Sequence, residues 1–152
     1  PIYKFVWIQC HPSNDAVHFQ VNFRDGGSSY DATKTTTAFR SYHDESNSTA
    51  EIGYRTGEDL AQGTGVHIIQ NNIDNANDAC SSGELWLFSP SSTTFVKHFI
   101  SRAINLGNSD AASDWFAAGY CNVTAAIDAV QFSMSAGNID AGTIKLYGIK
   151  DS

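Results

Sequence analysis

The chain has 152 residues, of which 41% are hydrophobic, 12% are aromatic and only 16% are charged. This length suits one domain with a hydrophobic core of its own. The low charged fraction and the many aromatic residues argue against a helical bundle and favour β-structure. The net charge of −7, with no cluster of Lys and Arg, argues against a nucleic-acid partner. No apolar run is long enough to predict a membrane-spanning helix.

The first two segments of the chain predict two strands. Residues 2–10 carry Tyr3, Phe5 and Trp7 on one face. Residues 16–24 alternate apolar and polar side chains with a period of two, which is typical of a strand with one buried face. A short polar turn separates the two segments, and we expect them to form a hairpin.

The middle of the chain carries weaker signals. Residues 35–43 are rich in Thr, Phe and Tyr and predict a third strand, and residues 52–55 predict a short one. Residues 63–82 are the least strand-like stretch. Their core, Val66-His67-Ile68-Ile69, fits either one helical turn or a strand, and we expect a long loop there with one short helix or helical turn. This loop is our candidate for a contact surface, because long loops in small domains usually serve a function.

The second half predicts five further strands. They are residues 83–88, 94–105, 114–121, 126–134 and 143–149. Gly137 and Gly142 favour tight turns, so we expect the last two strands to fold back on one another. Short strands at regular spacing, without a competing helical period, predict an all-β fold. We expect a jelly-roll-like antiparallel β-sandwich of about eight strands, with residues 1–152 in a single domain.

The three cysteines, Cys10, Cys80 and Cys121, are far apart and form no C-x-x-C motif. This count permits one disulfide, but it favours free thiols in a reducing compartment and predicts no zinc site. The chain opens at Pro1 without the basic and apolar segments of a signal peptide. We therefore expect removal of an initiator Met and synthesis in the cytoplasm.

The sequence offers no recognisable catalytic motif. The five histidines show no close spacing typical of a metal site, and the Asn- and Asp-rich run 71–78 lacks the spacing of a calcium loop. A glycan-cleaving enzyme would need two facing carboxyl groups. The loop carboxylates that could supply them are Asp44, Glu45, Glu58, Asp59, Asp74 and Asp78. Nothing in the sequence pairs them, so we expect no catalytic residue, no metal, no cofactor and no enzymatic activity.

Aromatic side chains offer a second kind of site, because their faces can stack on sugar rings. The three tryptophans all fall inside predicted strands, and we expect them to pack in the core. Tyr30, Tyr42 and Tyr54 lie near polar loops and are the candidate ligand-binding residues for a host glycan.

Three segments of the chain carry a family resemblance. They are Gly83-Glu84-Leu85-Trp86-Leu87-Phe88-Ser89-Pro90, Thr94-Phe95-Val96-Lys97-His98-Phe99 and Gly137-Asn138-Ile139-Asp140-Ala141-Gly142-Thr143-Ile144-Lys145-Leu146-Tyr147-Gly148-Ile149. With the aromatic strand, turn and alternating strand at the start, this pattern resembles a group of small structural proteins of marine tailed bacteriophages. The resemblance extends over nearly the whole chain and brings no catalytic motif with it.

The resemblance implies a virion structural protein. The role we expect is an auxiliary decoration or cement protein on the outside of the capsid, made in the host cytoplasm. Its partners would be the major capsid protein and further copies of itself, with a trimer as one arrangement. The alternative is a carbohydrate-binding module for host adhesion on a phage fibre or head.

Overall fold

The computed structural model describes residues 1–150, and this part of the chain contains ten strands and no helix. Every strand pairing is antiparallel. The strands are Ile2–Pro12 (β1), Val17–Arg24 (β2), Lys34–Asp44 (β3), Ala50–Tyr54 (β4), His67–Ile73 (β5), Ser81–Phe88 (β6), Lys97–Gly107 (β7), Ala111–Cys121 (β8), Ala129–Met134 (β9) and Ile139–Ile149 (β10).

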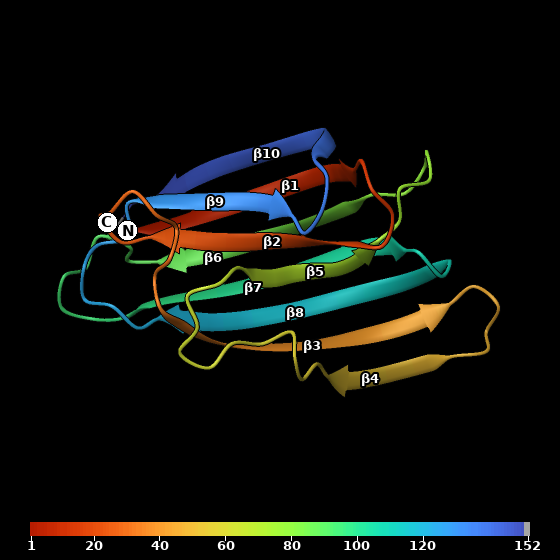
Figure 1. Cartoon of the computed structure of the whole chain (residues 1–152), viewed down its shortest axis with the longest axis horizontal. Coiled ribbons are helices and arrows are strands. Elements are labelled where there is room, and N and C mark those ends of the chain that lie inside the picture. The colour runs from red at the N-terminus through yellow and green to blue at the C-terminus, as the bar shows by residue number, and fades with distance from the viewer. Residues whose placement is uncertain (151–152) are drawn as a thin grey trace.

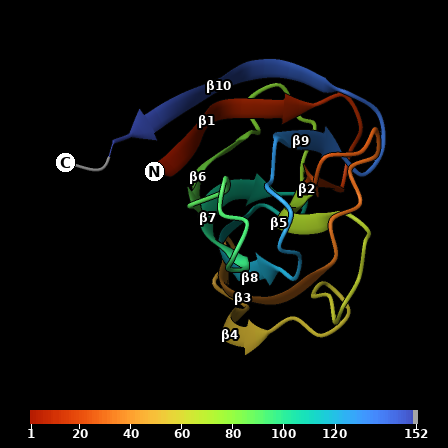
Figure 2. The same cartoon turned by 90° about the vertical axis from the view of Figure 1, so that its left-hand side faces the viewer.

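The strands form a larger and a smaller layer that share hydrogen bonds at one point. The larger sheet has the order β10-β1-β6-β7-β8-β3-β4, and the smaller sheet has the order β5-β2-β9 (Figure 1). The pair Ile73–Gly107 connects β5 to β7. Figure 2 shows the larger sheet curving around the smaller one, so that its concave side faces the smaller sheet.

The core fills the space between the two layers. Trp7 of β1 packs edge-on against Phe19 of β2, with 5.3 Å between ring centres. Phe23 of β2 lies 5.0 Å from Phe99 of β7. The rings of all four residues are fully buried. Because buried aromatic pairs combine a large apolar area with a defined geometry, these contacts fix the smaller sheet against the larger one.

The structure confirms the antiparallel all-β class and a sandwich of packed strands. It does not confirm jelly-roll connectivity. Nine predicted strand segments coincide with observed strands, within a few residues at each end. The long loop with a helical turn expected at residues 63–82 is wrong, because β5 occupies residues 67–73 and its Ile69 and Ile73 belong to the core.

Both predicted strand hairpins are also wrong. The strands β1 and β2 lie in different sheets, where β1 pairs with β10 and β6, and β2 pairs with β5 and β9. Similarly, β9 pairs with β2 while β10 pairs with β1. In both cases the short connection carries the chain from one layer to the other.

Candidate functional site

One face of the larger sheet is left uncovered by the rest of the chain, and we call it the outer face. Along β7 and β8, side chains that point to the smaller sheet are buried and the alternate side chains are exposed or half-buried. Several large apolar side chains on this face keep more than a third of their surface exposed. They are Ile8, Phe39, Ile52, Tyr54, Ile100, Ile104, Tyr147 and Ile149. Exposed apolar side chains that gather on one face are a feature of interaction sites.

The first charged cluster of the outer face joins β1 to β6. The strand register places Lys4 opposite Trp86. The Lys4 ammonium lies 2.5 Å from a carboxylate oxygen of Glu84 and 4.5 Å from the centre of the Trp86 ring. The indole N–H of Trp86 donates to Glu84 at 3.0 Å. The hydrogen bond from Lys4, followed by that from Trp86, lowers the pKa of Glu84 and keeps its carboxylate ionised.

A second cluster repeats this arrangement between β7 and β8. Arg102 stands opposite Phe116, 5.0 Å from the centre of its ring. The guanidinium donates two hydrogen bonds to Asp114, at 3.1 and 2.7 Å. In both clusters the carboxylate precedes the aromatic residue by two positions on the strand next to the cation. The Asp114 hydrogen bond and charge raise the pKa of Arg102.

A shallow groove of about 340 Å³ lies between the two clusters. Its walls include Trp86 and Phe116, and Ile100 lies between them. Phe39 stacks on Phe116 with 4.7 Å between ring centres and nearly parallel planes. The groove therefore combines aromatic faces with paired charges, which suits contact with another surface or with a sugar ring.

The three candidate tyrosines do not come together in the fold. Tyr54, on β4, is 52% exposed on the outer face. Tyr42 is half-buried on the other side of the larger sheet, with the Arg40 guanidinium 4.6 Å from its ring. Tyr30 is half-buried in the loop after β2, with the Arg24 guanidinium 5.8 Å away.

Only two of the three tryptophans lie in the core, whereas the sequence analysis predicted that all three would. Trp7 and Trp115 are fully buried, as expected, while Trp86 is half-buried on the outer face. Alternation along β6 contained this signal, because Trp86 lies between two residues that point into the core, Leu85 and Leu87. Sequence reasoning missed Lys4, Glu84 and Arg102 as site residues.

One open groove of about 590 Å³ is lined by three of the six loop carboxylates, Asp44, Glu45 and Asp78. Asp44 accepts hydrogen bonds from the side chain and backbone of Ser48 and from the backbone of Thr49, and these hydrogen bonds lower its pKa to about 2. Glu58 pairs with Arg55 at 3.1 Å. In the part of the chain that the structure describes, no three His, Cys, Asp or Glu side chains gather as a metal site would require.

The sandwich interior contains a polar region that the sequence did not indicate. His67 is fully buried, and its Nδ1 lies 3.1 Å from the hydroxyl of Thr36. Burial, and then the charge of Lys34, lowers the pKa of His67 to about 4. Gln70 donates to Asn105 at 2.7 Å and thereby connects β5 to β7. This network satisfies only part of the buried polar groups where the two sheets meet, because His67 Nε2 and Gln70 Oε1 have no hydrogen-bond partner in the described residues.

A small polar cavity of about 120 Å³ lies beside this network, lined by Arg40, Asn71 and Ser113 among others. Each of these three side chains has a buried polar atom without a hydrogen-bond partner in the described residues. The size and polarity of the cavity suit a few water molecules.

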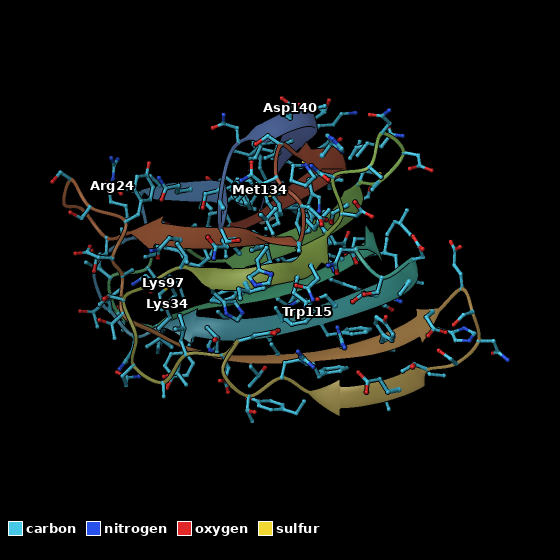
Figure 3. The ribbon with its side chains drawn as sticks, turned by 45° about the vertical axis from the view of Figure 1, so that its right-hand side comes forward. Arg24, Lys34, Lys97, Trp115, Met134 and Asp140 are labelled. Atoms are coloured by element: carbon cyan, nitrogen blue, oxygen red, sulfur yellow. The ribbon has the colours of Figure 1, made fainter. Side chains whose placement is uncertain are left out.

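Two buried lysines, Lys34 and Lys97, lie at one end of the sandwich (Figure 3). The strand register places each of them opposite Cys121. The ammonium of Lys34 donates to the carbonyl of Ala32 at 2.8 Å, and that of Lys97 donates to the carbonyl of Val123 at 2.8 Å. These hydrogen bonds hold the loops that close this end, and we assign the lysines a structural role.

The cysteines Cys10, Cys80 and Cys121 are all free thiols. Burial raises the pKa of Cys10 to about 11 and that of Cys121 to about 12. Both side chains therefore stay protonated near neutral pH, which disfavours their reaction as nucleophiles.

Residues 1–150 include no helix that could cross a membrane. Comparisons of the chain with protein-family models, with curated proteins and with solved structures return no match. The outer face is the candidate site because it combines exposed apolar side chains with two clusters of paired charges.

Proposed function

We propose that this chain is a non-enzymatic structural protein of a virus particle, an auxiliary protein that decorates or cements the exterior of the capsid. It is made in the host cytoplasm and ends on the capsid surface, with the major capsid protein as its partner. The observation that carries this proposal is the uncovered outer face. A broad, convex surface (Figure 2) with exposed apolar side chains suits binding to a large partner, whereas small-molecule sites are concave.

The chemistry of the outer face supports a binding role. Its carboxylates are held by cations, and the lowered pKa of Glu84 is opposite to the raised pKa that a general acid needs. The resemblance to small structural proteins of marine tailed bacteriophages supports the virion as the place where this surface is used.

The test is the copy number of this chain in purified virus particles, counted by quantitative mass spectrometry against the major shell protein. A decoration or cement protein gives a ratio near a simple fraction of the shell protein. A few copies per particle would instead indicate a fibre, and absence from the particle would contradict the proposal.

A second candidate is a carbohydrate-binding module for host adhesion. The groove between Trp86 and Phe116 favours it, because aromatic walls beside charged side chains are suited to a sugar ring. If a glycan binds there, Trp86→Ala abolishes binding to host surface polysaccharide in a glycan-array assay. Phe95→Ala, which removes an exposed ring outside the groove, serves as the control and leaves binding intact. Binding that survives Trp86→Ala would rule out this groove.

A further inference from the structure

Four charged side chains of the outer face form an alternating string across four neighbouring strands, and a fifth, Lys145 of β10, lies opposite Val6 beyond the end of the string. Lys4 on β1 is followed by Glu84 on β6, Arg102 on β7 and Asp114 on β8. The order of signs is plus, minus, plus, minus. When such a string is reversed, every position carries the opposite sign. The string is therefore complementary to a reversed copy of itself.

We propose that the outer face binds the outer face of a second copy of this chain, with a two-fold axis that crosses the string between Glu84 and Arg102. The axis lies in the plane between the larger sheets of the two copies, at right angles to the string. It places Glu84 opposite Arg102 of the second copy and Lys4 opposite Asp114 of the second copy. A two-fold interface of this kind uses the same surface on both molecules.

The same axis also matches apolar side chains with one another. Strands lie about 4.8 Å apart, and side chains on one face of a strand lie about 6.8 Å apart. On this grid the axis brings Trp86 opposite Phe116 of the second copy and Val6 opposite Ile104 of the second copy. The strands of the two copies cross at about a right angle, which is one of the two usual geometries of packed sheets.

Arg102 has 64% of its side-chain surface exposed and Glu84 has 40%, so both can reach a second molecule. Each charge keeps its partner within the chain, which limits the desolvation penalty of covering it.

This inference rests on the face that the proposed function assigns to the capsid protein, and it gives that face a second copy of the chain as partner in the free protein, so the dimer dissociates when the face binds the capsid. Its test uses the isolated chain and does not depend on a virus particle. The full chain is examined by analytical ultracentrifugation, and the wild type sediments as a dimer. Glu84→Arg and Arg102→Glu each place like charges opposite one another across the axis. We expect each variant alone to dimerise at least tenfold more weakly.

The decisive sample is an equal mixture of the two variants. In a mixed dimer, Arg at position 84 of one chain faces Glu at position 102 of the other, and the unchanged Arg102 and Glu84 face each other. The mixture therefore recovers the dimer that neither variant forms alone. Arg24→Glu reverses a charge of a similar surface ion pair outside the outer face, and this control variant stays dimeric.

Circular dichroism verifies that each variant is folded. The variant Ile100→Lys tests the same face without changing the ion pairs. Ile100 is 49% exposed on the outer face, so a charge there would be buried in the dimer, and we expect this variant to be monomeric. A monomeric or trimeric wild type would overturn the inference. So would a mixture of the two charge variants that stays monomeric. Neither result would change the number of copies found in particles, so failure of this inference can be distinguished from failure of the proposed function.

Discussion

At the scale of single residues, His67 is the titratable side chain most affected by its surroundings. This residue of β5 is fully buried and contacts Thr36 of β3. Burial, and then the charge of Lys34, lowers its pKa from 6.5 to about 4. The protonated imidazole is thus more stable in the unfolded chain than in the folded one. Its contribution to stability is complete above about pH 6.5 and is lost as the pH falls towards 4.

We therefore predict that the free energy of unfolding decreases between pH 7 and pH 4, with about 3 kcal/mol of the decrease due to His67. Denaturant titrations at several pH values measure it. His67→Gln removes this part of the pH dependence, whereas the exposed His98→Gln keeps it. An equally steep decrease in the His67→Gln variant would contradict the assignment.

Single residues also explain why the site could not be located from the sequence. The alternation along β6 placed Trp86 on the side away from the core, so this residue could have been found. The ion pairs Lys4–Glu84 and Arg102–Asp114 depend on strand register. For β1 and β6 that register joins segments about half the chain apart, and no local pattern gives it.

At the scale of elements, Gly83 of β6 is the glycine of the larger sheet whose neighbours leave the least room for a side chain. A Cβ atom at this position would lie 2.5 Å from the Trp7 ring and 2.6 Å from the carbonyl oxygen of Arg102. The missing side chain lets Trp7 of β1 lie across β6 within the core. Gly83 thereby sets how closely β1, β6 and β7 can pack behind the outer face.

We predict that Gly83→Ala destabilises the protein by about 2 to 3 kcal/mol, because the new methyl group overlaps backbone and a buried ring. Thermal and denaturant unfolding measure the change. Gly53→Ala on β4 is the matched control: a Cβ there meets nothing within 4 Å, so its effect stays within about 0.5 kcal/mol. Equal stability of the two variants would contradict this account of β6.

Elements differ in how well the sequence predicted them. Strands β2, β7 and β8 follow the period of two because one face is buried, and their positions were predicted. Strand β5 was missed because polar side chains such as Gln70 and Asn71 are buried in it, and irregularities in its register with β2 break the alternation. The pairing of strands was mispredicted since short turns do not tell whether the chain stays in one sheet.

At the scale of the whole molecule, two sheets of unequal size explain why one surface stays uncovered. Three strands cover the concave side of a seven-stranded sheet, and nothing within residues 1–150 covers the opposite side (Figure 2). With a net charge of −7, the molecule as a whole repels copies of itself, so association needs a local surface where opposite charges meet. The outer face provides such a surface.

The most direct test of the outer face as an interface is hydroxyl-radical footprinting of the wild-type chain at low and high protein concentration, read by mass spectrometry. Our account predicts that oxidation of Trp86 and Ile104 decreases as the concentration rises. Oxidation of Tyr30, which lies in the loop after β2, stays constant. Equal oxidation of Trp86 and Ile104 at both concentrations would contradict the claim that this face meets a second copy of the chain.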